Sequence, residues 1–351
     1  MYIQPPTIEE FDIVKSEHKP QLSIILPSAH IENWIKIYNS IIAATKYSFE
    51  LIIVTPCFDG PLFHLFWSLS NVKIVKDFGS PVRSHCIGAS LAEGTLITWI
   101  PDDGVFTAGG LDSAIDKLYE MEENKKNIIT YKFTENEKVY IDEYYKINFH
   151  RGKSGEGIAS DYISDDYYLL NHCVMYREYY EELGGLDCSY EGTAMALVDF
   201  SIRAQYDGAE VELLTGMPIL ICSQFSAGDP RHTDIEEAQH TRDEPLYEDI
   251  YKCPNWEEKK VVKLDYGSEW KKAPIAWTQK WAPIREAARK QFASIYGPES
   301  CPAAYGVLRG NWKAKISGNS QMFLDAGKGM QPLSPSQAPY RTSTQPKSRE
   351  I

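Results

Sequence analysis

The sequence predicts an α/β fold in which a mainly parallel sheet is covered by helices. In the first half of the chain, short apolar runs alternate with helical patterns, the order expected of strands joined by crossover helices. The run 96–100 does not alternate between apolar and polar residues, which is typical of a strand buried on both faces. With 351 residues, 43% of them hydrophobic, the chain can form one large domain with an extension, or two domains.

The elements of the first half follow from their individual patterns. Apolar runs predict strands over 22–26, 49–54, 72–75 and 96–100, and helical spacing predicts helices over about 32–45, 82–92 and 109–122. In the helix over 82–92, Val82, Cys86 and Ala89 share one face, and Gly94 suits its C-terminal stop. Arg83 is therefore expected in the first turn, near the carboxyl ends of the strands.

The second half is more varied. Short aromatic-rich strands and polar loops between 127 and 168 predict a hairpin and a mobile loop. The glycines of 151–157 lack the order GxxxxGK[ST] of a phosphate-binding loop, so a flexible surface loop is the better interpretation. Farther on we expect a strand over 173–176, a helix over 177–183, a turn at Gly184 and Gly185, a helix over about 195–206 and a strand over 211–214.

The chain is expected to divide into an extension over 1–20, a main domain over 21–245, a helical extension over 246–320 with a helix near 283–295, and a disordered tail over 321–351 that ends rich in Ser, Pro, Gln and Thr. Residues 1–20 show no hydrophobic signal core, and no stretch approaches the ~18 apolar residues of a membrane span. The prediction is a cytoplasmic protein without a transmembrane segment, and peripheral attachment to a membrane surface is left open.

Charge and cysteine content exclude some functions. A formal net charge of −13 argues against nonspecific binding to nucleic acid, because phosphate-tracking surfaces need clustered Lys and Arg. A phosphate-bearing substrate would therefore need local cations. The 7 cysteines form no CxxC pair and are odd in number, which indicates buried thiols in a reducing compartment and neither a zinc ribbon nor a complete disulfide framework.

Two adjacent acids, Asp102 and Asp103, directly follow the buried strand over 96–100. Neighbouring carboxylates repel each other unless a cation or hydrogen-bond donors compensate, and hard ions such as Mg²⁺ or Mn²⁺ favour carboxylate oxygens. However, Pro-Asp-Asp-Gly is also common turn chemistry. Taken alone, the pair favours the turn.

Six blocks in order extend this picture. They are Ser23-Ile-Ile-Leu-Pro-Ser28, the strand over 49–54, Asp77-Phe-Gly-Ser-Pro-Val-Arg83, Ile87-Gly-Ala-Ser-Leu-Ala-Glu-Gly94, Trp99-Ile-Pro-Asp-Asp103 and Leu183-Gly-Gly-Leu-Asp187. With these blocks the chain resembles family-2 glycosyltransferases of the GT-A fold over roughly residues 20–215. The resemblance implies a mixed sheet with helices on both faces, a nucleotide-diphosphate-sugar donor, a glycan or other hydroxyl acceptor, and a Mn²⁺ or Mg²⁺ ion.

The resemblance assigns donor contacts to several positions. Pro27 and Ser28 would border the nucleotide, although a strand terminator is an equal alternative. The acid that normally contacts the base is displaced here, so Asp59 or Thr55 would reach it. Arg83 would bind near the donor, since a guanidinium forms forked contacts with phosphate; its alternative role is a surface ion pair.

The resemblance also implies a metal site. Asp103 would be the metal ligand, and Asp102 would support it or contact the ribose. After the last strand, His232 is the first candidate for a returning histidine ligand and His240 the second, which would favour Mn²⁺ over Mg²⁺. Either histidine could instead be merely solvated.

The catalytic base is harder to place. The Glu-Asp pair of the family falls on Ala196 and Leu197 here, so the expected base is missing. Glu191 and Asp199 are the nearby candidates. Asp199 could instead pair with Arg203 at the i, i+4 spacing, and Glu191 could be a solvated loop acid or an acceptor-binding group.

Four tryptophans could form an acceptor platform or simply pack a helical extension: Trp256, Trp270, Trp277 and Trp281.

The leading hypothesis is a metal-dependent glycosyltransferase that acts with inversion. A donor-binding module without catalysis is the first rival, favoured by the missing Glu-Asp pair. A nucleotidyltransferase is the second, although such an enzyme would carry a glycine-rich loop after its first strand, where this chain has Pro27-Ser-Ala-His30. A dehydrogenase is disfavoured because no GxGxxG follows that strand.

Overall fold

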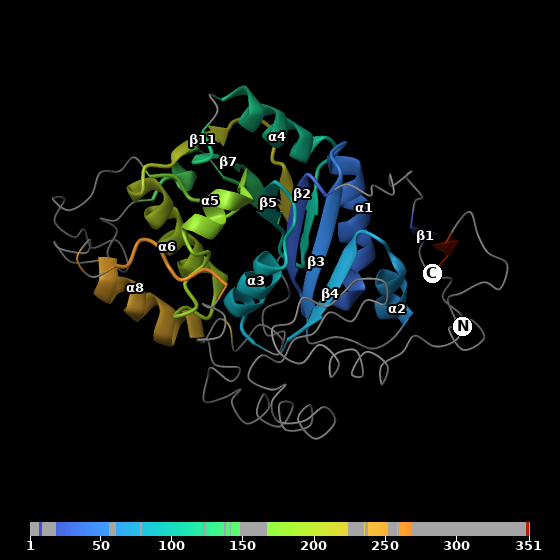
Figure 1. The fold of residues 1–351 in the computed structure, drawn as a ribbon, viewed down its shortest axis with the longest axis horizontal. Helices are drawn as coiled ribbons and strands as arrows, with labels where there is room; N and C mark the ends of the chain where they lie inside the picture. Colours follow the sequence, from blue (N-terminus) through green and yellow to red (C-terminus); the bar gives the residue numbers. More distant parts are fainter. Residues whose placement is uncertain are drawn as a thin grey trace, which may run out of the picture.

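The computed structural model describes a mixed α/β protein (Figure 1). The residues that it describes are 7–8, 19–55, 61–77, 79–121, 124–136, 138–140, 142–147, 167–223, 235, 238–251, 258, 260–267 and 349–350.

A seven-stranded sheet forms the centre of the molecule. Its strand order is β4-β3-β2-β5-β10-β7-β11. The strands are β2 (Leu22–Pro27), β3 (Phe49–Thr55), β4 (Val72–Lys76), β5 (Leu96–Trp99), β7 (Asn127–Tyr131), β10 (Cys173–Tyr176) and β11 (Glu210–Leu214). Within this sheet β10 runs antiparallel to both of its neighbours, and the other pairings are parallel.

Helices cover both faces of the large sheet (Figure 1). The helices are α1 (Trp34–Ala44), α2 (Pro61–Ser68), α3 (Pro81–Ser90), α4 (Gly110–Glu120), α5 (Arg177–Glu182), α6 (Thr193–Tyr206) and α8 (Glu244–Tyr251), with 3-10 turns η1 (Ile31–Asn33) and η2 (Asp142–Tyr145) and a π-helical turn η4 (Gln239–Asp243). Ile24 of β2 packs in one core cluster with α1, α2 and α4, whereas Ile25 packs in the other with α3, α5 and α6. Successive side chains of a strand point to opposite faces, so one buried strand serves both cores.

A smaller sheet extends beyond the carboxyl ends of β5 and β7. Its order is β6-β12-β8-β9, formed by β6 (Gly104–Phe106), β12 (Leu220–Cys222), β8 (Phe133–Glu135) and β9 (Lys138–Val139). The acid pair Asp102-Asp103 is the whole connection between Pro101 and β6. A separate two-stranded pairing joins β1 (Thr7–Ile8) to β13 (Arg349–Glu350).

The predicted α/β class is confirmed, since the sheet is mixed and helices lie on both of its faces. The expected hairpin after residue 127 is present as β8 and β9. Helix α2 was not predicted. The boundary expected between residues 245 and 246 falls inside α8, and the helix expected near 283–295 and most of the predicted tail lie outside the described residues. Among the described residues, no helix combines the length and apolar character needed to cross a membrane.

Candidate functional site

The site lies where the chain changes direction across the large sheet. From β2 the chain adds β3 and then β4 on one side, and it returns to add β5 on the other side of β2. In open α/β sheets, ligands bind beyond the carboxyl ends of the strands at such a switch point. The segments at this position are Ser28 to His30 after β2 and Asp102 with Asp103 after β5.

Asp102 joins the two segments. Its Oδ2 atom accepts hydrogen bonds from the backbone N–H of Ala29 at 2.7 Å, from that of His30 at 3.0 Å and from His30 Nδ1 at 2.8 Å. Asn33 Nδ2 donates to the Asp102 carbonyl oxygen at 2.8 Å. The turn predicted from Pro-Asp-Asp-Gly is present, since the Gly104 N–H donates to the Pro101 carbonyl oxygen at 3.0 Å, and it holds the Asp102 carboxylate at the carboxyl ends of β2 and β5.

Asp103 lies in a strongly acidic environment. Burial, followed by the neighbouring Asp102 carboxylate, raises the pKa of Asp103 to about 7, and Glu135 of β8 adds to the rise. Burial also raises the pKa of the Cys222 thiol, and the Asp103 and Glu135 charges raise it further. Because Cys222 pairs with Gly104 on one side and with Glu135 on the other, the small sheet brings a third carboxylate toward the acid pair.

Ser28 is a structural acceptor at the end of β2. Its hydroxyl accepts hydrogen bonds from Trp34 Nε1 at 2.8 Å and from the His30 N–H at 3.3 Å, and its own N–H donates to Val54 O at 2.9 Å. Pro27, half-buried, is the last residue of the strand. These contacts agree with the role of strand terminator and leave donor contact a proposal.

Arg83 lies in the first turn of α3, as expected, but its ion pair is not at the surface. Both Arg83 and Asp77 are fully buried, and Arg83 Nε lies 3.0 Å from Asp77 Oδ2. The Gly79 N–H donates to the same oxygen at 2.7 Å. A Cβ on Gly79 would lie 2.1 Å from Arg83 Cδ, so only glycine lets the guanidinium approach the loop this closely.

Glu191 is buried, 1% exposed, in the loop before α6. Its Oε1 lies 3.1 Å from Arg242 Nη1. The carboxylate of Asp243 accepts hydrogen bonds from the N–H groups of Glu191 and Gly192, at 3.1 Å and 2.7 Å. At the other end of the loop, Asp187 accepts from the Ser189 N–H at 2.8 Å. The backbone that carries Glu191 is thus fixed from both ends.

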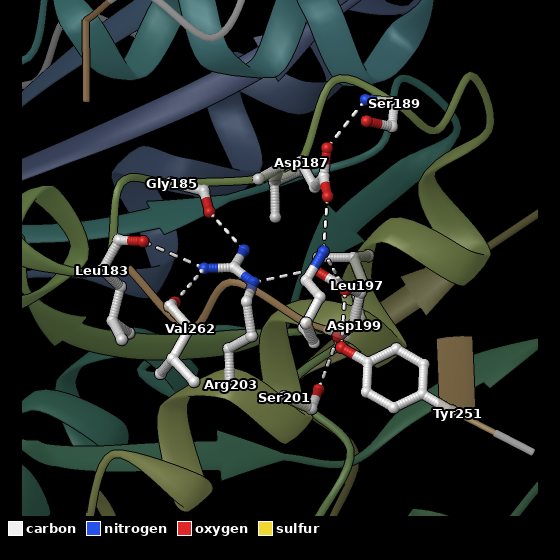
Figure 2. A network of polar contacts seen from close by, with 12 residues as sticks. Leu183, Gly185, Asp187, Ser189, Leu197, Asp199, Ser201, Arg203, Tyr251 and Val262 are labelled. Carbon is white, nitrogen blue, oxygen red and sulfur yellow. Dashed lines mark hydrogen bonds and ion pairs between the residues drawn. The ribbon is translucent and has the colours of Figure 1, made fainter. Parts of the chain in front are cut away.

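Asp199 is engaged in a different network. Its carboxylate accepts from Arg203 Nε at 2.8 Å and from the Tyr251 hydroxyl at 2.7 Å, and Lys260 Nζ lies 2.7 Å away. Figure 2 shows the Arg203 guanidinium facing the carbonyl oxygens of Leu183 and Gly185, to which it also donates. The ion pair foreseen as the alternative role of Asp199 is present, and both partners are fully buried.

Comparisons with known proteins give limited similarity. No family model matches the sequence. No curated protein matches it either. Two crystal structures of S. aureus TarS, a glycosyltransferase, resemble the chain with a TM-score of 0.44 each, at 11% and 12% identity. Both alignments cover 83% of this chain; they cover 59% of the longer TarS chain and 97% of the chain comprising residues 1–349. With TM-scores below 0.5, these two similarities support no conclusion about this chain.

Several predicted residues lie outside the described part of the chain. They are Asp59, His232 and the tryptophans 256, 270, 277 and 281. Ser223, the last described residue before His232, donates its N–H to the Asp103 carbonyl oxygen at 3.3 Å. His240 is described, and its Nδ1 lies 2.9 Å from Glu244 Oε1 on an exposed helical surface.

The donor set at the acid pair fits a hard divalent cation. All of its side chains are carboxylates, and the Asp102 and Glu135 charges add to the burial that raises the pKa of Asp103, so a cation would offset negative charge there. The described residues contain no group of three or more His, Cys, Asp and Glu side chains arranged to hold a metal. A bound ion would therefore take its remaining ligands from the substrate or from the rest of the chain.

Sequence reasoning missed two residues of the site. His30 is fully buried against Asp102, and Asp77 orients Arg83. Their sequence signals were present, since His30 follows the first strand by three residues and Asp77 follows the third directly. Polar residues immediately after parallel strands deserve a place among site candidates.

Proposed function

We propose that this protein is a metal-dependent glycosyltransferase that moves a sugar from a nucleotide-diphosphate donor to a glycan or other hydroxyl acceptor, with inversion. One observation carries the proposal. Asp102 bridges the ends of β2 and β5 at the switch point, with Asp103 beside it. An acid pair at this position of an α/β sheet suits a ligand that brings both hydroxyl groups and phosphates.

The donor would lie across the ends of β2 to β5. Asp102 uses Oδ2 for its three protein donors, so Oδ1 would accept a hydrogen bond from the ribose. Pro27 and Ser28 would border the nucleotide, Asp59 would reach the base, and Arg83, buried against Asp77, would lie near the donor at the start of α3. Asp103, joined by His232, would hold a Mn²⁺ or Mg²⁺ ion whose charge offsets that of the departing diphosphate.

Glu191 is the better candidate for the base. An acceptor hydroxyl would give its proton to a Glu191 oxygen while its own oxygen forms a bond to the anomeric carbon and the bond to the diphosphate breaks. Asp199 already accepts from Arg203 and Tyr251 and has Lys260 beside it, so proton transfer to it would disrupt three contacts.

A donor-binding module without catalysis is the second candidate. The observation that favours it is the position of the family's Glu-Asp pair, where Ala196 and Leu197 are buried and apolar. In this case the donor site at Asp102 would function, and Glu191 would be a buried partner of Arg242 with no chemical role.

The deciding experiment is a screen of nucleotide sugars against the purified protein, with and without Mn²⁺. Calorimetry would measure binding, and release of nucleoside diphosphate would measure turnover. Metal-dependent binding with turnover supports the transferase, and binding without turnover supports the module. Absence of any nucleotide binding would contradict both.

The assignment of the base has its own test. Glu191→Gln should abolish turnover, and Asp199→Asn should mainly lower stability. Normal turnover in both variants would refute the assignment of the base.

A further inference from the structure

Two tyrosines stack at the outer end of the small sheet. The ring centroids of Tyr140 and Tyr144 lie 3.9 Å apart, with 21° between the ring planes. Tyr144 keeps 40% of its surface exposed. Two buried rings support the stack, because Phe133 lies 5.5 Å from Tyr140 and Tyr145 lies 5.5 Å from Tyr144 between centroids. Tyr140 and Tyr144, named the tyrosine stack below, thus form an aromatic surface that packs on two buried rings.

A carboxylate borders the stack. The Tyr140 hydroxyl donates a hydrogen bond to Glu135 Oε2 at 2.8 Å. Glu135 is half-buried, so its carboxylate can meet a ligand without full loss of solvent. An apolar ring face next to hydrogen-bonding oxygens matches a sugar, which presents C–H groups on its faces and hydroxyl groups around its rim.

The register of the small sheet places this group beside the acid pair. Glu135 of β8 pairs with Cys222 of β12, and Cys222 pairs with Gly104 of β6, which follows Asp103. Directly paired residues share a face, and adjacent strands lie about 4.8 Å apart, so Glu135 lies about 10 Å from the Gly104 backbone. The donor residues come from the ends of β2 to β5, whereas the tyrosine stack approaches Asp103 from the small sheet.

We propose that the tyrosine stack and Glu135 form an acceptor subsite that binds a sugar ring. The inference rests on the proposed glycosyltransferase function and names the acceptor class as a carbohydrate. The C–H face of the sugar packs on the ring of Tyr144, and a hydroxyl group of the sugar donates a hydrogen bond to Glu135. The subsite does not use the tryptophans 256, 270, 277 and 281. Its residues belong to the small sheet, to the residue that follows it and to the turn η2.

A packing role alone gives a different expectation. If Tyr144 only packs, its 40% exposed ring contributes little apolar area to the core, so removing the ring should cost little stability and no ligand affinity. The carboxylate would then be a solvated partner of the Tyr140 hydroxyl and would not affect any ligand. If the subsite binds carbohydrate, in contrast, that binding depends on both the ring of Tyr144 and the charge of Glu135.

The test uses the full chain with Mn²⁺ and a panel of neutral oligosaccharides fixed to a surface. Tyr144→Ala should lose at least about tenfold in affinity for the oligosaccharides that the wild type binds, since tenfold corresponds to one lost stacking contact of about 1.4 kcal/mol. Tyr144→Phe should retain binding, and Glu135→Gln should weaken it. Tyr119→Ala, which removes a tyrosine that is 45% exposed on α4, is the matched control and should bind as the wild type does. Urea unfolding would confirm that each variant is folded.

Each outcome has a defined meaning. No carbohydrate binding by the wild type, equal affinity of Tyr144→Ala and wild type, or an equal loss in Tyr119→Ala would overturn the subsite. Donor turnover by the wild type is measured separately. Turnover with binding that is independent of Tyr144 leaves the proposed function standing and removes the subsite. Binding that depends on Tyr144 without turnover leaves the subsite standing as a carbohydrate site and removes the transferase.

Discussion

At the scale of single residues, Asp102 has a structural role beside the ribose contact that we propose for it. Its Oδ2 satisfies the N–H groups of Ala29 and His30. Removing the carboxylate takes away one acceptor from these N–H groups and from the His30 ring, at a cost of about 1–3 kcal/mol. We therefore expect Asp102→Ala to lower the free energy of unfolding by this amount. Asp102→Asn, whose amide oxygen still accepts from the backbone, should recover part of the stability but not the donor affinity.

Urea unfolding and nucleotide-sugar calorimetry would separate these two effects. Asp116→Asn is a suitable control, because the Asp116 side chain is 45% exposed and solvent screens its pair with Lys46. If Asp102→Asn binds donor as tightly as the wild type, the carboxylate does not contact the ribose.

At the scale of elements, helix α6 depends on Arg203. This guanidinium ties α6 to the Leu183 and Gly185 carbonyls of the preceding turn and to Asp199 within the helix. Arg203→Met removes the guanidinium from the buried Asp199 carboxylate. Removing one partner of a buried ion pair lowers the free energy of unfolding by about 3–5 kcal/mol. Tyr251→Phe removes a single hydrogen bond to the same carboxylate and should cost about 1–3 kcal/mol. Similar unfolding midpoints for the two variants would contradict this ranking.

The start of α6 should respond to pH through Asp243. Burial raises the pKa of Asp243 to about 6, against the hydrogen bonds from Gly192 and Glu191 that lower it. The folded protein therefore binds this proton more tightly than the unfolded chain, in which the pKa of an aspartate is about 3.8. The contribution of Asp243 to stability is full below about pH 4 and is lost as the pH rises to about 6. Urea midpoints measured across this window should fall more steeply for the wild type than for Asp243→Asn, and parallel profiles would show that another group titrates.

The elements also show how far the sequence could predict this molecule. Strands β2, β3, β4 and β5 were predictable, because their apolar runs are bounded by clear breaks. Helix α2 was not, since Leu-Phe-His-Leu-Phe-Trp is a short, mostly apolar run that fits a strand as well as a helix. The three-residue strands β6 and β12 are too short to show any period.

The candidate site divides in the same way. The acid pair and the position of Arg83 follow from local order, whereas the contact between His30 and Asp102 spans 72 residues and that between Glu191 and Asp243 spans 52. Contacts of this kind form only when strands and helices have packed, so no local sequence pattern predicts them. The Asp199–Arg203 pair could be foreseen because its i, i+4 spacing lies within one helix.

At the scale of the whole molecule, the net charge of −13 affects how metal binding must be measured. An acidic surface attracts divalent ions weakly at many places, and this attraction is screened by salt. A specific ion at Asp103 should instead depend on that one carboxylate. Any ligand that binds only the folded state stabilises it, by about 2.7 kcal/mol at a concentration of 100 times its Kd.

We therefore expect Mn²⁺ with a nucleoside diphosphate to raise the unfolding temperature of the wild type in 0.15 M salt, and a chelator to reverse the rise. Asp103→Asn should lose this shift, whereas Asp112→Asn, which removes a half-buried carboxylate of α4, should keep it. Because burial and the nearby carboxylates raise the pKa of Asp103 to about 7, protons compete with the ion, and the shift in the wild type should grow between pH 6 and pH 8. A shift of equal size in Asp103→Asn would place the ion elsewhere and remove the support that the acid pair gives to the transferase.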